Sequence, residues 1–439
     1  MSEQMQVNDQ SPERAIIVGV HVRGQETVLS LDESLEELTM LTETAGMQVV
    51  GQIIQNLNHI EPSTYIGSGK VKEVMELIEE LGAKVVIFDD ELSPRHQREL
   101  SKTFGEEINL LDRSALILDI FAQHASTREG ALQVELAQYE YRLPRLTRQW
   151  THLARQAGGM GGAGGVGVRG PGETQLEVDR REIGRKIIKL KDELEKVRQH
   201  RQSHRANRRK TGIPTVALVG YTNAGKSTLI NALTESDVYV ADQLFATLDP
   251  TTRRVVLPSN REILISDTVG FIQKLPTTLI AAFRATLEEI LEADLILHIV
   301  DTSHPSVLAH IETVEDTLAV IEASHVPRIL VWNKIDKISV DIPPLLEDSD
   351  NYVSEVRVSA KTHAGFETLL NDIANTLAAQ LKPMKLLLPY DRGDIVSYLF
   401  ESGRVTNQEH VAEGVVLDVQ MPVSLYERYK DYEYSEVDL

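Results

Sequence analysis

A glycine-rich motif near the middle of the 439-residue chain limits its possible folds more than any other feature. Residues 216–220 form an apolar, β-branched run, residues 220–227 match G-x-x-x-x-G-K-[ST], and residues 228–233 resemble the start of a helix. A loop between a strand and a helix can wrap its backbone N–H groups around phosphates. In such a loop Lys226 reaches the β- and γ-phosphates, and the Ser227 hydroxyl ligates Mg²⁺. The alternative is a glycine-rich turn with a solvated lysine, which the flanking strand and helix disfavour.

A second motif, Asp267-Thr-Val-Gly270, ends the apolar strand expected at 263–266. We expect Asp267 to hold Mg²⁺ through water and the Gly270 N–H to contact a γ-phosphate, which makes the segment after it sensitive to the nucleotide. Phe271 stands where many small GTPases have the glutamine that orients the attacking water. Intrinsic hydrolysis should therefore be slow and depend on a partner.

A third motif predicts which base is bound. Asn333-Lys-Ile-Asp336 ends the apolar strand expected at 329–332. The Asp336 carboxylate can accept hydrogen bonds from both N1–H and the exocyclic amine of guanine, whereas adenine has neither donor on that edge. The stem of Lys334 can lie over the ring, and Ser359-Ala-Lys361 can supply a backbone contact to the guanine carbonyl. Together the motifs predict an enzyme that binds GTP and GDP and hydrolyses GTP.

The segment between the first two motifs contains several threonines. One of them must close over Mg²⁺ when the γ-phosphate is present. We favour Thr247, with Thr251 and Thr252 as rivals; alternatively these threonines only cap a turn. Within the phosphate loop, Asn223 could hold a K⁺ ion that substitutes for an arginine finger, or it could merely brace the loop.

Charge is distributed unevenly along the chain. The net charge of −21 argues at first against a nucleic-acid partner. However, residues 180–210 contain 13 Lys and Arg against four acids, whereas residues 391–439 contain 11 acids against four Lys and Arg. A solvated helix face is the ordinary explanation for such a basic run. Here it adjoins a loop, residues 158–172, with nine glycines, and Arg155 and Arg169 flank or lie in that loop. Glycines permit close backbone approach, so the pair of features favours an arm that contacts RNA phosphates.

The fold class expected is α/β, with a doubly wound P-loop GTPase sheet, a smaller N-terminal α/β domain, an antiparallel helical hairpin and a small C-terminal α/β piece. Apolar residues spaced 4-3-4-3 in 132–146 and 183–197 predict the hairpin, with Pro144 disturbing the end of its first helix. The predicted boundaries are a tail at 1–13, the N-terminal domain at 14–128, the hairpin arm at 129–210, the GTPase domain at 211–381 and the acidic C-terminal domain at 382–439. The chain has no cysteine, no secretory signal and no apolar run long enough to span a bilayer, so we expect a cytoplasmic protein.

With these motifs in hand, the chain resembles the HflX family of translational GTPases. The resemblance rests on residues 64–71 (TYIGSGKV), 112–122 (DRSALILDIFA), 170–175 (GPGETQ) and 245–250 (FATLDP). It implies binding to the large (50S) ribosomal subunit and its rRNA, and GTP-dependent splitting of stalled or idle ribosomes under stress. We expect a monomer. It also implies catalytic roles for Lys226, Thr247 and Gly270, and direct Mg²⁺ ligation by Ser227 and Thr247. By position, the implied nucleotide contacts are Gly220, Tyr221, Thr222, Asn223, Ala224, Gly225, Lys226, Ser227, Thr228, Phe245, Ala246, Thr247, Leu248, Asp249, Asp267, Thr268, Val269, Gly270, Asn333, Lys334, Ile335, Asp336, Ser359, Ala360 and Lys361.

Two other functions compete with a ribosomal switch. An ATP- or GTP-driven RNA remodeller would need a second nucleotide site, and residues 67–70 (GSGK) are the only other candidate. They fail on spacing, because Thr64 stands where the first glycine belongs and Val71 replaces the Ser or Thr. We expect a left-handed turn that caps the following helix instead. A GTP-sensing scaffold at a membrane surface is disfavoured by the acidic balance and by the lack of a basic amphipathic helix at either terminus.

Overall fold

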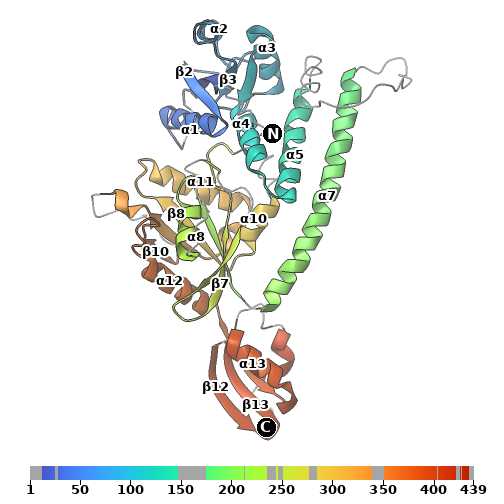
Figure 1. The fold of residues 1–439 in the computed structure, drawn as a ribbon, viewed down its shortest axis with the longest axis vertical. Coiled ribbons are helices and arrows are strands. Elements are labelled where there is room, and N and C mark those ends of the chain that lie inside the picture. Colours follow the sequence, from blue (N-terminus) through green and yellow to red (C-terminus); the bar gives the residue numbers. More distant parts are fainter. Residues whose placement is uncertain are drawn as a thin grey trace, which may run out of the picture. The chain divides into compact units, whose positions relative to one another are not determined.

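The computed structural model describes residues 12–24, 28–146, 175–211, 213–234, 244–245, 251–275, 284–338, 351–402, 404–421, 426 and 428–434 (Figure 1). The chain forms two compact units. The first contains the residues up to Leu194 together with two short later segments, Asp242–Leu248 and Gln273–Arg284. The second contains the rest of the chain.

A four-stranded parallel sheet, with strand order β2-β1-β3-β4, lies at the centre of the first unit. Parallel neighbours require crossover connections, and helices provide them between successive strands. The small N-terminal α/β domain expected from the sequence is confirmed. The elements in chain order are β1 (Glu13–Val22), α1 (Leu31–Thr44), β2 (Met47–Leu57), α2 (Ser68–Leu81), β3 (Val85–Phe88), α3 (Pro94–Phe104), β4 (Asn109–Asp112) and α4 (Arg113–His124).

Successive strand residues point to opposite faces, so this sheet carries two apolar layers. Helices α2 and α3 cover the face that includes Ile16, Val18 and Phe88. Helix α1 packs on β1 and β2 and also contacts α4. Because both faces are covered, β3 (Val-Val-Ile-Phe) is buried along its whole length and shows no alternation in its sequence.

The segment before α2 differs from the prediction. Gly67, its N-cap residue, has an extended backbone (φ −64°, ψ 151°) rather than the left-handed turn expected. Its N–H donates to the Gln55 side chain at 3.0 Å, so a neighbouring strand and not a turn supplies the partner. The left-handed residue is Tyr65 (φ 66°), two positions earlier.

A helical hairpin extends from the first unit. Helix α5 (Arg128–Arg142) passes into a short 3₁₀ turn, η1 (Leu143–Arg145), that contains Pro144, as expected for a proline that ends a helix. Helix α7 (Gln175–Thr211) lies beside it in Figure 1. Leu136, Ile187 and Leu190 form the buried seam between them, and Lys191 of α7 pairs with Glu140 of α5 at 2.8 Å. The predicted antiparallel pairing of two apolar stripes is thus confirmed; the glycine loop predicted at its tip lies outside the described residues.

The second unit is built on a six-stranded sheet in the order β10-β9-β8-β5-β7-β6, in which only the edge strand β6 is antiparallel. Helices α8 and α12 pack on one face, and α11 packs on the other face over Val300 and Trp332. This is the doubly wound sheet predicted from the motifs. Its elements are β5 (Thr215–Gly220), α8 (Lys226–Thr234), β6 (Thr252–Val256), β7 (Glu262–Asp267), α10 (Arg284–Leu291), β8 (Leu295–Asp301), α11 (Val307–Val320), η3 (Ala323–His325), β9 (Arg328–Asn333), η4 (Ile335–Lys337), β10 (Ser354–Arg357) and α12 (Phe366–Ala379).

The chain ends in a small antiparallel sheet, ordered β11-β13-β12, with one helix against it. Ile395 and Leu399 of the helix pack on the sheet around Leu386 and Leu417. The small C-terminal α/β piece expected from the sequence is confirmed. The elements are β11 (Lys382–Leu388), η6 (Tyr390–Arg392), α13 (Gly393–Ser402), β12 (Arg404–Val411), β13 (Gly414–Met421) and η7 (Lys430–Tyr432). Across the described part of the chain, no helix combines the length and apolarity needed to cross a membrane.

Candidate nucleotide-binding site

The glycine-rich loop lies where the sequence predicts, between the carboxyl end of β5 and the start of α8. Two of its glycines are required by their surroundings. A β-carbon on Gly220 would lie 2.3 Å from the Ile299 carbonyl oxygen, and one on Gly225 would lie 2.4 Å from the Asn333 amide nitrogen. Both residues also have positive φ, at 154° and 95°. The loop can therefore approach β8 and β9 only because these positions lack side chains.

Lys226 is folded along this loop and is only 6% exposed. Its Nζ donates to the carbonyl oxygens of Gly220 at 2.9 Å and Tyr221 at 2.8 Å. Burial lowers the pKa of Lys226 to about 8, and the charge of Asp267 acts against this shift. A buried ammonium whose partners are neutral carbonyls has a strong electrostatic preference for an anion such as phosphate.

Ser227 and Asp267 come together from α8 and β7. The Ser227 hydroxyl donates to Asp267 Oδ2 at 2.8 Å, and Asp267 is 2% exposed. Hydroxyl and carboxylate oxygens are the hard donors that Mg²⁺ prefers, so this pair fits the ion. The adjacent Thr268 hydroxyl donates to the Leu218 carbonyl at 2.5 Å, which fixes the start of the second motif against β5.

Gly270 lies close against the phosphate loop. A β-carbon there would lie 3.1 Å from Lys226 Nζ and 3.0 Å from Thr222 Cγ2. The next residue, Phe271, exchanges backbone hydrogen bonds with the loop, since its N–H donates to Gly220 at 3.1 Å and its carbonyl accepts from Thr222 at 2.8 Å. The first two motifs are thus joined by main-chain contacts.

The predicted base-recognition residues also meet. The Asp336 carboxylate accepts a hydrogen bond from the Ser359 hydroxyl at 2.6 Å. Asn333, 1% exposed, donates to the Ala224 carbonyl at 2.9 Å and accepts from the Ala360 N–H at 3.0 Å. Its amide therefore links the phosphate loop to the 359–361 segment. The third motif thus connects the predicted phosphate contacts to the predicted base contacts.

Lys334 has a partner that the sequence reasoning missed. Its Nζ donates to the Asn223 carbonyl at 2.8 Å and forms an ion pair with Asp301 Oδ2 at 2.7 Å. Burial alone would raise the pKa of Asp301, but the hydrogen bonds from Lys334 and Ser303, together with the charge of Lys334, lower that pKa. A sequence signal existed, because Asp301 follows an apolar strand directly, as Asp267 does.

The remaining predicted residues are placed only in part. Phe245 is described and buried, whereas Ala246–Asp249, and with them Thr247, lie outside the described residues. Of the rival threonines, Thr252 lies in β6, and its hydroxyl forms a hydrogen bond with that of Ser266 in β7 at 2.9 Å. The Thr251 carbonyl accepts the Asp267 N–H at 2.9 Å.

Comparison with known proteins identifies the family. Four family models match the chain: "GTP-binding GTPase N-terminal" at 32–122, "GTP-binding GTPase Middle Region" at 124–208, "50S ribosome-binding GTPase" at 215–334 and "HflX C-terminal domain" at 345–428. A "GTPase HflX" from Caldanaerobacter subterraneus is 43% identical over 96% of this chain and 94% of its own length. The chain belongs to the HflX family of GTPases. It is therefore a GTP-hydrolysing enzyme with a P-loop GTPase fold.

Other HflX relatives match over a similar span. The Alkalihalophilus pseudofirmus protein is 45% identical over 95% of this chain and 96% of its own length, and the Escherichia coli protein is 41% identical over 97% of each. Among solved structures, a GTP-binding protein from Sulfolobus solfataricus in complex with GDP is 25% identical, covers 83% of this chain and 98% of its own, and has a TM-score of 0.43. Family membership rests on the relatives and the family models.

Proposed function

We propose that this HflX GTPase binds GTP and Mg²⁺ at the joined motifs and acts as a nucleotide-controlled switch on the large ribosomal subunit, splitting stalled or idle ribosomes under stress. Lys226 would neutralise the β- and γ-phosphates, and the Gly270 N–H would contact the γ-phosphate. Asp336, held by Ser359, would accept both guanine donors, and residues 359–361 would contact the guanine carbonyl.

The residues that would hold the metal are Ser227 and Thr247 directly and Asp267 through water. When bound, Mg²⁺ would supply positive charge that neutralises the phosphates of the nucleotide. The chain's own contribution is to position oxygens, and the 2.8 Å contact between Ser227 and Asp267 supports this assignment. Closure of Thr247 over the ion would distinguish the GTP form from the GDP form.

One observation carries the ribosomal part of the proposal: the described lysines and arginines of α7 are exposed to solvent. The structure describes side chains of this helix up to residue 199, and all eight Lys and Arg among them are exposed. Ile187 and Leu190 of the same helix are buried against α5, so the helix is fixed in a hairpin. A helix held in this way, with exposed lysines and arginines, suits contact with an RNA backbone, which is recognised through its phosphates and shape. A family description that names 50S binding agrees with this partner, and a ribosomal partner implies a cytoplasmic location.

Sedimentation through a sucrose gradient tests the proposal. The protein is loaded with separated subunits and intact ribosomes in GDP or in a non-hydrolysable GTP analogue. We expect co-migration with the large subunit in the analogue and weaker binding in GDP. Co-migration with neither subunit in either nucleotide would contradict the ribosomal assignment and leave the GTPase assignment standing.

A charge-matched pair of variants tests whether α7 makes the contact. R180Q/R185Q/K189Q removes three exposed charges from α7, and K72Q/K84Q/R95Q removes three exposed charges elsewhere. Log affinity falls with log salt concentration, and each phosphate contact makes this fall steeper. If each of the three α7 residues contacts one phosphate, the first variant should make the slope less negative by about 2 to 3. The second variant should leave it unchanged. Equal slopes in the two variants would place the RNA contact somewhere other than α7.

A further inference from the structure

The segment 301–303, at the carboxyl end of β8, contacts the third nucleotide motif through two adjacent residues. The Thr302 N–H and hydroxyl both donate to the Asn333 carbonyl, at 3.1 Å and 2.6 Å. Asp301 Oδ2 lies 2.7 Å from Lys334 Nζ. Strands β8 and β9 are parallel, with Asp301 opposite Asn333, so the register of the sheet brings the segment and the motif together.

The Asp301 carboxylate is oriented by a neighbour in its own segment. Its other oxygen, Oδ1, accepts hydrogen bonds from the Ser303 N–H at 3.0 Å and from the Ser303 hydroxyl at 2.6 Å. Turning the carboxylate away from Lys334 would break these two bonds. The side chains of Asp301 and Lys334 are only 16% and 18% exposed, so their ion pair is screened less than an ordinary surface pair.

Lys334 is held in an uncommon conformation. Its backbone is left-handed (φ 64°), which a non-glycine residue keeps only where its surroundings impose it. A lysine side chain also has many rotamers, and fixing one of them costs conformational entropy. The Asp301 carboxylate and the Asn223 carbonyl, which accepts from the same Nζ at 2.8 Å, together fix the ammonium group.

The stem of Lys334 lies against the phosphate loop. A β-carbon on Gly225 would be 3.8 Å from Lys334 Cε, an ordinary van der Waals contact. The side chain therefore runs across the loop at Gly225 and ends between Asn223 and Asp301. A side chain fixed in this way loses little further freedom when a ligand packs on it, and such pre-organisation raises affinity.

We infer that Asp301 is a positioning residue for guanine-nucleotide binding: it holds Lys334 across the phosphate loop, where the lysine stem can pack on the base. The inference rests on the proposed assignment of Lys334 to the guanine ring. GDP and GTP share the base, so loss of Asp301 should weaken both nucleotides equally. A change in binding common to the ground state and the transition state should raise KM and leave kcat unchanged.

Equilibrium titration of the purified full-length protein with GDP and with a non-hydrolysable GTP analogue tests this role. D301N keeps the size of the side chain and removes its charge, and it should weaken both ligands by about tenfold. K334M keeps an apolar stem, removes the ammonium group and should have a similar effect. The D301N/K334M double variant should bind about as K334M does, because both changes remove the same ion pair. D316N, at an exposed position of α11, is the matched control and should bind normally.

GTP turnover gives a second readout, which a general loss of folded protein would not imitate. In D301N the KM for GTP should rise by about tenfold, with kcat within twofold of the wild type. D301E, which restores a carboxylate, should recover most of the lost affinity. A fall in kcat at unchanged KM would overturn the inference.

The binding data separate failure of this inference from failure of the proposed site. Wild-type affinity in D301N together with weakened binding in K334M would overturn the role of Asp301 and leave the base site standing. Fully additive losses, about a hundredfold in the double variant, would also overturn it. Unchanged affinity in K334M would contradict the base assignment itself, and the role of Asp301 with it.

Discussion

Replacing Asn333 with alanine should remove the hydrogen bonds that connect the phosphate loop to the 359–361 segment. The Asn333 amide donates to the Ala224 carbonyl at 2.9 Å and accepts from the Ala360 N–H at 3.0 Å, and the side chain is 1% exposed. The change deletes two hydrogen bonds, each with a net value of about 1 kcal/mol. It also leaves two buried backbone groups without these partners, at a further cost of about 1 kcal/mol or more each.

The two lost hydrogen bonds alone, at about 2 kcal/mol together, give the expected magnitude. If this free energy is lost from GDP binding, GDP affinity falls roughly thirtyfold. Any remainder should appear as a lower melting temperature. The assay is equilibrium titration and dissociation of a fluorescent GDP derivative, with thermal melting of the same samples. Exposed Asn371 of α12 provides a matched control, since N371A removes the same group from a surface position. GDP affinity within twofold of wild type, together with an unchanged melting temperature in N333A, would refute the reasoning.

Two further predictions concern an ion and a proton. If Asn223 holds K⁺ during hydrolysis, the GTP turnover rate should be higher in potassium than in sodium buffer and N223A should remove the difference; equal rates in the wild type would exclude the ion. Burial lowers the pKa of His298, which is 1% exposed, below its usual value of about 6.5, so the unfolded chain binds this proton more readily than the folded one. The free energy of unfolding should therefore fall as pH drops below about 6.5, by at most about 1.4 kcal/mol per pH unit from this group. Urea denaturation at pH 7.5 and 5.5 should show a smaller fall in H298Q than in the H59Q control, and equal falls would contradict the assignment.

The nucleotide motifs were predictable because each couples a fixed residue spacing to a strand end. Gly220–Ser227, Asp267–Gly270 and Asn333–Asp336 all follow apolar strands, and parallel strands bring their carboxyl ends to one edge of the sheet. The sequence therefore predicts which residues meet. Asp301 belongs to the same pattern and was missed because a lone acid after a strand matches no motif.

The first unit was harder to predict, for physical reasons. Helix α1 carries a complete capping box at Ser30 and Glu33, a local signal that could have located it. Strand β4 has only four residues, and its sequence (Asn-Leu-Leu-Asp) does not alternate. The Gly67 cap was predicted in the wrong conformation because its partner, Gln55, comes from a different strand. Local sequence does not encode such a contact.

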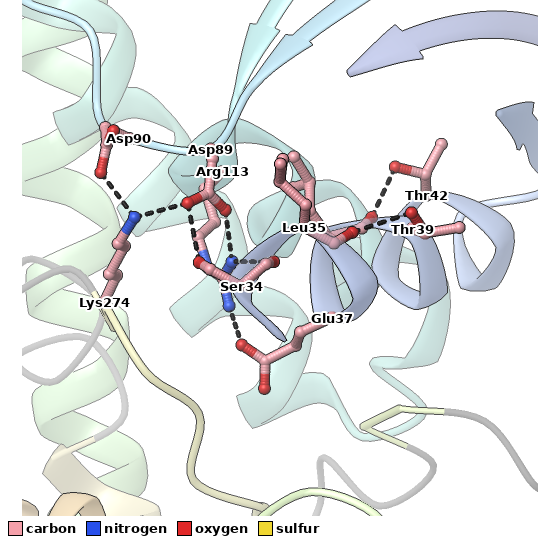
Figure 2. Close-up of polar contacts among 10 residues, drawn as sticks. Ser34, Leu35, Glu37, Thr39, Thr42, Asp89, Asp90, Arg113 and Lys274 are labelled. Carbon is pink, nitrogen blue, oxygen red and sulfur yellow. Dashed lines mark hydrogen bonds and ion pairs between the residues drawn. The ribbon is translucent and has the colours of Figure 1, made fainter. Parts of the chain in front are cut away.

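The ion pair between Lys274 Nζ and Asp89 Oδ2, at 2.5 Å (Figure 2), shows the same limit over a longer separation in sequence. The two residues are separated by 185 positions. Asp89 directly follows an apolar strand, but nothing in either local sequence pairs it with Lys274. Only the fold shows that Asp89 is fully buried and lies against two cations, Arg113 and Lys274. Long-range charge balance of this kind has to be taken from the structure.

Guanine selectivity is measured most directly by exchanging the base preference. In D336N the carboxylate that would accept both guanine donors becomes an amide, which can donate to the second carbonyl of xanthine. We predict that D336N loses affinity for GTP by about a hundredfold or more and binds xanthosine triphosphate more tightly than GTP. If D336N instead binds GTP as tightly as the wild-type protein does, Asp336 does not contact the base, and the nucleotide site assigned to this chain is wrong.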